Sequence, residues 1–417
     1  MNSEPLLADI RTVAVYSCAT PQHALGYLRL WGPLTGLGLQ VNWHLPGDEF
    51  AARQIESADV VIVQRDFPRF TARFAQILQA AAAAHRPVIY DIDDLLWELP
   101  ADHPDRRSHF YTTALWPMLL AALAADAVTV ASPDLQEYLQ PLNPSVFLLP
   151  NLIDLRLWEQ GSVRTPDTDM TWFGYIGGSS HGPDLQMIAP VLQALLNEHP
   201  GKVGLKFWGI EPPPDMAGHP QVRWTPLAPG DYAAFARLVT PADFDIAIAP
   251  LASNRFNAAK SAIKYLEYSA LGLPGVYSRV GSYADVVVHR RTGWLAETLD
   301  DWRSGLEHLM EFPAERQAMA AQARTDLRTR WLMQDHQSIW LSAYQQVKHA
   351  YMPREATRQL AEILISIQAA QEEKQAAEER LGQELQLLVS ELDEIKSSRG
   401  GQLLQAYWNL RGRLNKS

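Results

Sequence analysis

The chain has 417 residues, of which 47% are hydrophobic, and its formal net charge is -11. A chain of this length is too long for one ordinary hydrophobic core, and its apolar content excludes a wholly disordered chain. The acidic balance argues against broad nucleic-acid binding, which needs a basic face. Cys18 is the single cysteine, which excludes an internal disulfide and a CxxC redox or zinc motif. The first ten residues lack the pattern of a secretory signal, so we expect a cytoplasmic protein.

Short apolar runs alternate with helical patterns through the first 150 residues. Val and Ile dominate these runs with little polar alternation, which is typical of parallel strands covered on both faces. Alternation of strands and helices predicts right-handed βαβ units. The predicted strands lie at 12–17, 40–45, 58–64, 86–92, 126–131 and 145–150.

The same pattern restarts after a polar stretch at 159–169. Its predicted strands lie at 170–176, 202–209, 221–227, 244–251, 273–278 and 293–297. We therefore expect an α/β fold of two Rossmann-like domains facing a cleft, with a C-terminal helical extension. The predicted boundaries are 1–158 for the first domain, 159–330 for the second, 331–352 for a helix packing back across both, and 353–417 for the tail.

The tail predicts a coiled coil. Its apolar residues recur with alternating spacings of four and three, which fits a heptad seam, although three polar residues interrupt the middle. The seam is Leu360, Leu364, Ile367, Gln371, Lys374, Glu378, Leu381, Leu385, Leu388, Leu392 and Ile395. It predicts a homodimer or a docking helix for a partner enzyme, with a partly frayed helix as the alternative. Residues 401–417 are basic and amphipathic, so they could touch anionic lipid.

The most informative segment runs from 244 to 278. A buried strand ends in a polar loop, and the following helix carries Lys260, Lys264 and Glu267. Ligands of open α/β sheets bind beyond the carboxyl ends of strands, and helix amide groups attract phosphate. Lys260 and Lys264 are one turn apart, so both ammonium groups can lie on one face. Glu267 could accept hydrogen bonds from a ribose diol. The alternative is a solvated helix with a Lys–Glu pair.

A second candidate loop follows the strand at 170–176. Gly177, Gly178 and Ser179 connect it to a helix that begins near Pro183. Glycines there let backbone amides approach an anion. The loop does not match G-x-G-x-x-G, which excludes a dinucleotide fingerprint. His181 at the helix start is a candidate ligand or catalytic group, or alternatively a helix-cap histidine.

Three aspartates, Asp91, Asp93 and Asp94, follow the buried strand at 86–92. Adjacent carboxylates can bind a divalent cation. We instead expect one of them to line the cleft and orient an acceptor hydroxyl, while the others cap the next segment. The loop after the first strand adds Tyr27 and Arg29, and Arg29 could contact a phosphate or be a surface arginine.

These segments resemble the family-four retaining glycosyltransferases (group 1), which have the two-Rossmann GT-B fold. The resemblance rests on F-N-x-x-K-S-x-x-K-Y-L-E at 256–267 with A-L-G-L-P after it, on the loop at 177–184, and on Y-D-x-D-D at 90–94. It implies transfer of a sugar, with retention, from a nucleotide-diphosphate donor to a glycan, lipid-linked saccharide or protein. The co-substrate is then the nucleotide sugar, and neither a further cofactor nor a metal is expected.

The resemblance also implies residue roles. The implied donor-binding residues are Gly177, Gly178, Ser179, Asn257, Lys260, Ser261, Lys264 and Glu267. The implied catalytic residues are Asp91, His181 and Lys260, and the implied acceptor or cleft residues are Tyr27, Arg29, Asp93 and Asp94. The chain departs from the family's Glu-x7-Glu motif, because Ala259 stands where the first, sugar-contacting glutamate is expected.

Two alternatives to a transferase remain at this stage. Ala259 favours a glycosyltransferase-like binding or scaffold protein without turnover. A sugar-nucleotide 2-epimerase shares the fold, and fold alone does not discriminate function. We rank the epimerase lower because such enzymes should lack the 256–267 helix pattern.

Overall fold

The computed structural model describes residues 10–158, 170–227, 230–240, 243–352, 355–398 and 400–404. The chain divides into two compact units, residues 1–359 and 360–417. The polar stretch at 159–169, the proposed domain linker, and the basic end from 405 onward lie outside the described residues. No helix in the described part of the chain is both long enough and apolar enough to cross a membrane.

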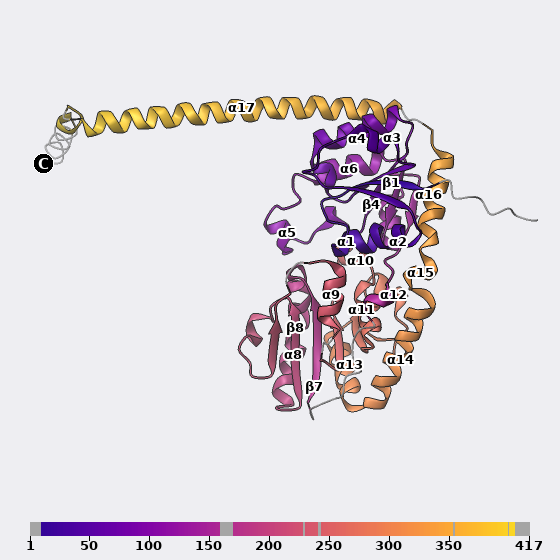
Figure 1. Ribbon diagram of the computed structural model, residues 1–417. Coiled ribbons are helices and arrows are strands. Elements are labelled where there is room, and N and C mark those ends of the chain that lie inside the picture. The colour runs from indigo at the N-terminus through magenta and orange to yellow at the C-terminus, as the bar shows by residue number, and fades with distance from the viewer. Residues whose placement is uncertain are drawn as a thin grey trace, which may run out of the picture. The chain divides into compact units, whose positions relative to one another are not determined.

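The first sheet has six parallel strands in the order β2-β1-β3-β4-β5-β6 (Figure 1). Every residue of β3, β4 and β5 is buried, as expected for strands covered on both faces. All six strands predicted in this half are confirmed. The strands are β1 (Thr12–Tyr16), β2 (Gln40–His44), β3 (Val60–Gln64), β4 (Val88–Ile92), β5 (Ala127–Val130) and β6 (Val146–Leu148).

Helical segments connect these strands. The loop after β1 leads into one continuous helical stretch whose middle turn has π geometry, η1 (Tyr27–Trp31). The helices of this domain are α1 (Ala24–Gly26), α2 (Gly32–Gly36), α3 (Ala52–Glu56), α4 (Thr71–Ala83), α5 (Pro104–Arg107), α6 (Leu115–Ala124) and α7 (Pro133–Leu139), with short turns η2 (Phe67–Arg69), η3 (Leu96–Glu98) and η4 (Leu155–Leu157).

The second sheet is also parallel, in the order β12-β11-β10-β7-β8-β9. The strand order reverses at β10 and β7, which is the switch point where open α/β sheets bind ligands. All six predicted strands of this half are confirmed too. They are β7 (Thr171–Gly177), β8 (Val203–Gly209), β9 (Val222–Thr225), β10 (Ile246–Ala249), β11 (Gly275–Ser278) and β12 (Trp294–Ala296).

The helices of the second sheet position the candidate donor residues. Two of them matter most for the site, α8 (Gly182–Glu198) after β7 and α11 (Ile263–Leu271) after β10. The others are α9 (Tyr232–Val239), α10 (Arg255–Ala258), α12 (Ser282–Val286) and α13 (Leu299–Glu311), with short turns η5 (Ser179–His181) and η6 (Pro214–Met216).

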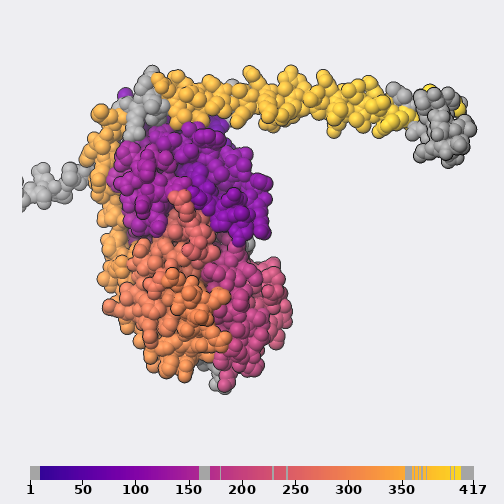
Figure 2. All heavy atoms as spheres, turned by 180° about the vertical axis from the view of Figure 1, so that it is seen from behind, coloured from indigo at the N-terminus to yellow at the C-terminus, as the bar shows by residue number. Residues whose placement is uncertain are grey.

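The chain then returns to the first domain. In Figure 1, α14 (Pro313–Arg330) and α16 (Ser338–Ala350) run along one side of the two sheets, joined by α15 (Met333–His336), and Figure 2 shows the orange surface of this part of the chain from behind. Trp340 of α16 is fully buried in the first core, and its indole N–H donates to the Arg29 carbonyl at 2.8 Å. The two crossing segments pair where Ile153 meets Leu332. Two connections therefore tie the domains together.

The second unit is dominated by helix α17 (Glu355–Ser397). The prediction of a helical tail is confirmed. Leucines along its seam are largely exposed, with 67% exposure at Leu381, 62% at Leu385 and 52% at Leu392. An exposed row of leucines on a single helix has no apolar partner within the helix itself. Pairing of α17 with another chain stays a prediction.

Candidate functional site

A cleft of about 630 Å³ lies between the carboxyl edges of the two parallel sheets. Its lining residues follow β1, β3 and β4 on one side and β7, β8 and β10 on the other. This is the volume of a typical small-molecule site. Because both sheets present the same edge to it, loops that are distant in sequence meet around one space.

Most of the predicted site residues line this cleft. On the first domain these are Arg29, Asp93 and Asp94, and on the second domain they are Gly177, Gly178, His181, Lys260, Ser261, Lys264 and Glu267. Three predicted residues do not appear in the lining, namely Tyr27, Asp91 and Asn257. The side chain of Ser179 lies outside the described ones.

Asp91 is fully buried, and its carboxylate is saturated by protein donors. Arg29 Nη2 lies 2.7 Å from Oδ1, Thr129 Oγ1 donates to the same oxygen at 2.8 Å, and Gln64 Nε2 donates to Oδ2 at 3.0 Å. A carboxylate with no exposed atom has no room to touch a substrate. We therefore replace the expected catalytic role of Asp91 with a positioning role: it holds the Arg29 guanidinium.

Arg29 is 1% exposed and lines the cleft on the side of the first domain. Its Nη1 also donates to the Leu149 carbonyl and, at 3.4 Å, to Asn151 Oδ1. The expectation of a surface arginine is excluded by this burial. A buried guanidinium that is paired with a carboxylate keeps a fixed orientation beside the cleft, with its charge balanced by Asp91.

Tyr27 and Asn257 also have structural partners. The Tyr27 hydroxyl donates to Asp154 Oδ2 at 3.0 Å, which links η1 to the segment that crosses between the domains. Asn257 Nδ2 donates to Asp184 Oδ1 at 2.8 Å and to the Ala252 carbonyl at 3.0 Å. Both amide protons of Asn257 are therefore used within the protein. We revise both residues from ligand contacts to supports of the cleft wall.

His181 is held by an acidic partner at the start of α8. Its Nδ1 lies 3.0 Å from Asp184 Oδ2, and Asp184 Oδ1 accepts from the Ala252 backbone and Asn257. A carboxylate partner assigns the proton of the neutral ring to Nδ1 and leaves Nε2 as an acceptor. Burial lowers the pKa of His181, opposed by Asp184, so the ring is neutral at pH 7.

The ends of β7 and β8 lie close together beside the loop at 177–184. Gly209 ends β8 with a positive φ of 92°, and a Cβ built there would lie 2.4 Å from the Gly177 carbonyl oxygen. Only glycine fits both the left-handed backbone and this spacing. Gly177 and Gly178, which also lack side chains, line the cleft at this point.

Lys260, Lys264 and Glu267 converge on the opposite wall, but not on one helix as predicted: Lys260 lies in the turn between α10 and α11, whereas Lys264 and Glu267 belong to α11. Lys264 Nζ lies 2.7 Å from Glu267 Oε2, and the Tyr232 hydroxyl donates to Glu267 Oε1 at 3.3 Å. Lys260 reaches across the cleft, with its Nζ 3.7 Å from Asp94 Oδ1. The side chains of Lys260 and Lys264 are only 16% and 15% exposed. The alternative of a solvated surface helix is therefore excluded.

Ala259 has a structural explanation. Helix α10 ends at Ala258, and Ala259 is 1% exposed with its carbonyl accepting a hydrogen bond from Ser132 Oγ of the first domain at 2.5 Å. Because Ala259 is buried, a glutamate side chain at this position would need space that neighbouring atoms fill. The departure from Glu-x7-Glu therefore stands at a buried residue whose carbonyl takes part in a contact between the domains.

Sequence reasoning missed several residues that line the cleft, and one of them, Arg65, is permanently charged. Arg65 follows β3 directly and has a positive φ of 50°. Its Nη1 lies 3.5 Å from Asp93 Oδ1, and its Nη2 lies 3.6 Å from Asp94 Oδ2. The rule that ligands bind beyond strand ends could have found it. His23 and Tyr232 were missed because their proximity arises only from a backbone contact between the domains, where Tyr232 N donates to the Gln22 carbonyl.

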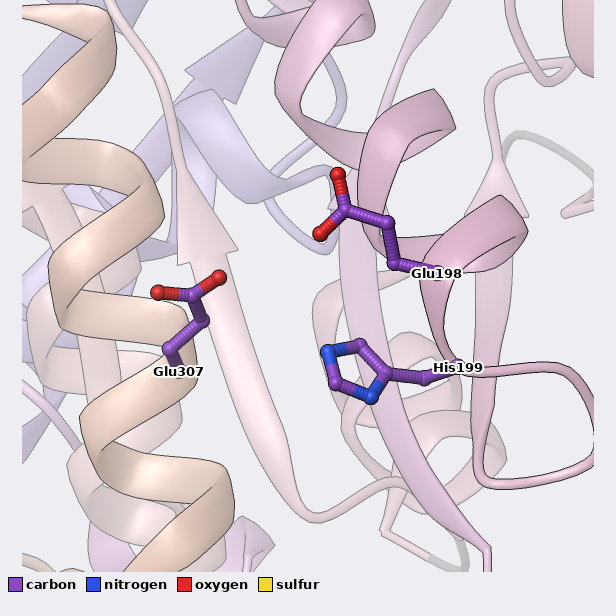
Figure 3. A group of neighbouring side chains, drawn as sticks. All are labelled: Glu198, His199 and Glu307. Atoms are coloured by element: carbon purple, nitrogen blue, oxygen red, sulfur yellow. The ribbon is translucent and has the colours of Figure 1, made fainter.

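One group among the described residues has metal-binding geometry, Glu198, His199 and Glu307 (Figure 3). It lies at the end of α8 and on α13 and does not line the cleft. Arg303 pairs with both carboxylates, contacting Glu198 and placing its Nε 2.9 Å from Glu307 Oε1. A single guanidinium therefore already contacts both carboxylates and balances one of their two negative charges. In the cleft, Arg65 and Lys260 likewise occupy the carboxylates of Asp93 and Asp94.

Two parallel six-stranded sheets with their carboxyl edges facing one cleft match the architecture of solved glycosyltransferases. This chain has the GT-B fold. HepE of Anabaena, solved with UDP-glucose, superposes with a TM-score of 0.53 at 13% identity, covering 81% of this chain and 98% of HepE. Sucrose-phosphate synthase from Thermosynechococcus elongatus gives 0.58 at 13% identity over 82% and 100%. A Rickettsia africae glycosyltransferase gives 0.55 at 10% identity over 82% and 100%.

No family model matches this GT-B chain, and no curated protein matches it by sequence. The structural likeness spans the two-domain body at an identity too low to carry residue roles. The roles of the residues therefore depend on the chemistry of the cleft itself.

Proposed function

We propose that the chain is a glycosyltransferase that moves a sugar from a nucleotide-diphosphate donor to a hydroxyl of a glycan, lipid-linked saccharide or protein. The observation that carries this proposal is the arrangement of Lys260, Lys264 and Glu267 on one wall of an interdomain cleft. Cations beside a helix start suit a diphosphate, and a carboxylate one turn further suits a ribose diol. HepE of Anabaena, which has the same fold, was solved with UDP-glucose.

Each donor residue has a separate task in this proposal. Lys264 and the backbone amides near Gly177 and Gly178 bind the diphosphate, and Glu267 holds the ribose. Lys260 offsets the charge that builds on the leaving diphosphate, a form of electrostatic stabilisation that is worth most in a water-poor site. Glu267 Oε2 lies 2.7 Å from Lys264 Nζ. Binding of the nucleotide would exchange this ion pair for contacts from Lys264 to phosphate and from Glu267 to ribose.

We also propose retention at the anomeric carbon, which the resemblance to family-four enzymes supports. The first-domain residues Arg29, Asp93 and Asp94 then face the acceptor, and Ser261, whose hydroxyl accepts from Asn151 Nδ2 at 2.9 Å, joins the domains beside the donor. Proton NMR of the product anomer is the measurement that reads retention or inversion.

A panel of nucleotide sugars, led by UDP-glucose, tests the transferase proposal. We expect a rise in melting temperature with the correct donor and slow release of the nucleoside diphosphate, accelerated by acceptor-containing cell extract. A catalytically silent binding or scaffold protein, which Ala259 favours, would show the thermal shift without release. A 2-epimerase would instead convert the donor sugar without transferring it.

We further propose that α17 joins two copies of the chain, or one copy and a partner enzyme. The exposed seam at Leu381, Leu385, Leu388 and Leu392 supports this, because coiled-coil positions of this spacing bury one another. A chain ending at residue 352 should sediment as a monomer, whereas the full chain should sediment as a dimer or larger. A matched variant with Leu385 and Leu388 changed to Ser should dissociate like the truncation. An unchanged oligomeric state would remove the role of the seam.

A further inference from the structure

The apolar seam of α17 contains two opposite charges near its middle. The heptad places Leu381 at position d and Leu385 at position a. It therefore places Lys374 at d and Glu378 at a. Their side chains are 76% and 67% exposed, and Lys374 Nζ lies 3.6 Å from Glu378 Oε1 within the helix. Because positions a and d meet the partner helix, a coiled coil of α17 has to accommodate both charges in its core.

The direction of the partner helix decides which charges face one another. In a parallel pair in register, each core residue meets its own copy, so Lys374 would face Lys374 and Glu378 would face Glu378. In an antiparallel pair, position a of one helix faces position d of the other, so Lys374 faces Glu378 twice. Like charges in a partly dry core repel, whereas opposite charges compensate one another. The charge pattern therefore favours an antiparallel partner in this register.

The same register also brings apolar residues together on both sides of the charges. Facing residues lie equally far from Ala376, which is the midpoint of α17. The two helices therefore overlap along their whole length, with no overhang at either end. The facing pairs of the central part are Lys374 with Glu378, Gln371 with Leu381, and Ile367 with Leu385.

The side chains of this central part are exposed in the single chain. Ile367 is 45% exposed and Leu385 is 62% exposed, whereas Leu364, nearer the start of the helix, is only 2% exposed. The contacts that define the register therefore lie between residues 367 and 385. Most other acidic residues of α17, such as Glu373 and Glu379, occupy outward heptad positions and do not enter the seam.

We propose that two copies of the chain pair through α17 as an antiparallel coiled coil centred on Ala376, with Lys374 of each copy facing Glu378 of the other. This inference rests on the proposed pairing of α17, and it commits that pairing to a second copy, because one sequence supplies both members of every facing pair about a two-fold axis. The two-domain body of each copy precedes its own α17. The bodies are therefore attached to opposite ends of a rod about 65 Å long, since its 43 residues rise about 1.5 Å each.

Disulfide cross-linking of the full chain measures the direction of pairing. Cys18→Ser first removes the native thiol, and Ile367→Cys and Leu385→Cys are then made in separate chains with tags of different size. After the two chains are mixed and exchange subunits, we expect disulfides between the two kinds of chain and little cross-linking within either kind. Disulfides that join two copies of the Leu385→Cys chain would show a parallel pair and overturn the proposal.

Variants of the central charges test the register. Lys374→Glu brings four acidic side chains together between the helices and should weaken dimerisation by about tenfold or more in analytical ultracentrifugation. The double variant Lys374→Glu with Glu378→Lys restores opposite charges and should dimerise like the wild-type chain. Arg380→Glu makes the same change of charge at an outward heptad position, so this control should leave the dimer unchanged. An undiminished dimer in Lys374→Glu would refute the register.

The possible results distinguish this inference from the functions proposed above. A full chain that sediments as a monomer would contradict both the pairing of α17 with a second copy and its direction. A dimer whose disulfides join identical positions would overturn the antiparallel direction alone. Lys374→Glu should release nucleoside diphosphate like the wild-type chain, because the cleft lies in the two-domain body. A wild-type chain without any release would contradict the transferase and leave the coiled coil unaffected.

Discussion

Replacing Lys264 with alanine should weaken UDP binding by about 100-fold. Lys264 is 15% exposed at the cleft wall, and a cation that meets a diphosphate in a partly dry site contributes a charge-assisted hydrogen bond. Truncating one member of such a pair costs about 2–5 kcal/mol, which spans this loss in affinity. Isothermal titration with UDP measures it directly.

The control for Lys264→Ala must separate lost binding from a damaged fold. Glu267 is 4% exposed and would lose its cation, so the single variant should also melt earlier. The double variant Lys264→Ala with Glu267→Gln removes the stranded charge, and it should regain stability without regaining affinity. Lys202→Ala changes an exposed lysine outside the cleft and should bind UDP normally. An unchanged affinity in Lys264→Ala would place the nucleotide elsewhere.

Replacing Asp91 with alanine should destabilise the first domain by about 3–5 kcal/mol, the usual cost of removing one partner of a buried ion pair. The Arg29 guanidinium is 1% exposed and would lose its only carboxylate within 4 Å among the described residues. Thermal unfolding measures the loss, which should amount to roughly 10 °C at about 2–4 °C per kcal/mol. Chain expression at reduced temperature keeps the variant measurable.

Two further variants, measured in the same way, distinguish a positioning role of Asp91 from a catalytic role. Combining Asp91→Ala with Arg29→Met removes both charges and should recover much of the lost stability. Asp91→Asn keeps the shape and one acceptor, so it should be less destabilised than Asp91→Ala. If Asp91→Asn instead melted like the wild-type chain and had lost all turnover, Asp91 would be a catalytic residue after all.

The strands of this protein were predictable because their local pattern is sufficient. β3 and β4 are apolar runs interrupted only by Gln64 and Asp91, and a run of this kind is buried on both faces wherever it sits in a parallel sheet. The helix that places Lys264 and Glu267 on one face was predictable for the same reason, since they are three residues apart, but Lys260 lies in the turn between α10 and α11 and not on that helix. Strand order, in contrast, depends on which helices cover which face.

Which charged groups reach the cleft depends on contacts between distant segments, and no local sequence pattern shows these contacts. Asp91, Asp93 and Asp94 look equivalent in the sequence, but Asp91 is in β4 and points into the core, where Arg29 arrives from 62 residues away. Arg65 reaches Asp93 and Asp94 only because β3 and β4 are neighbours in the sheet. The sequence by itself determined two α/β domains and the helix with Lys264 and Glu267 after a strand, because these follow from periodicity. The tertiary structure alone decided which charged groups are buried, paired or free to meet a ligand, because burial and pairing arise from segments that are distant in the chain.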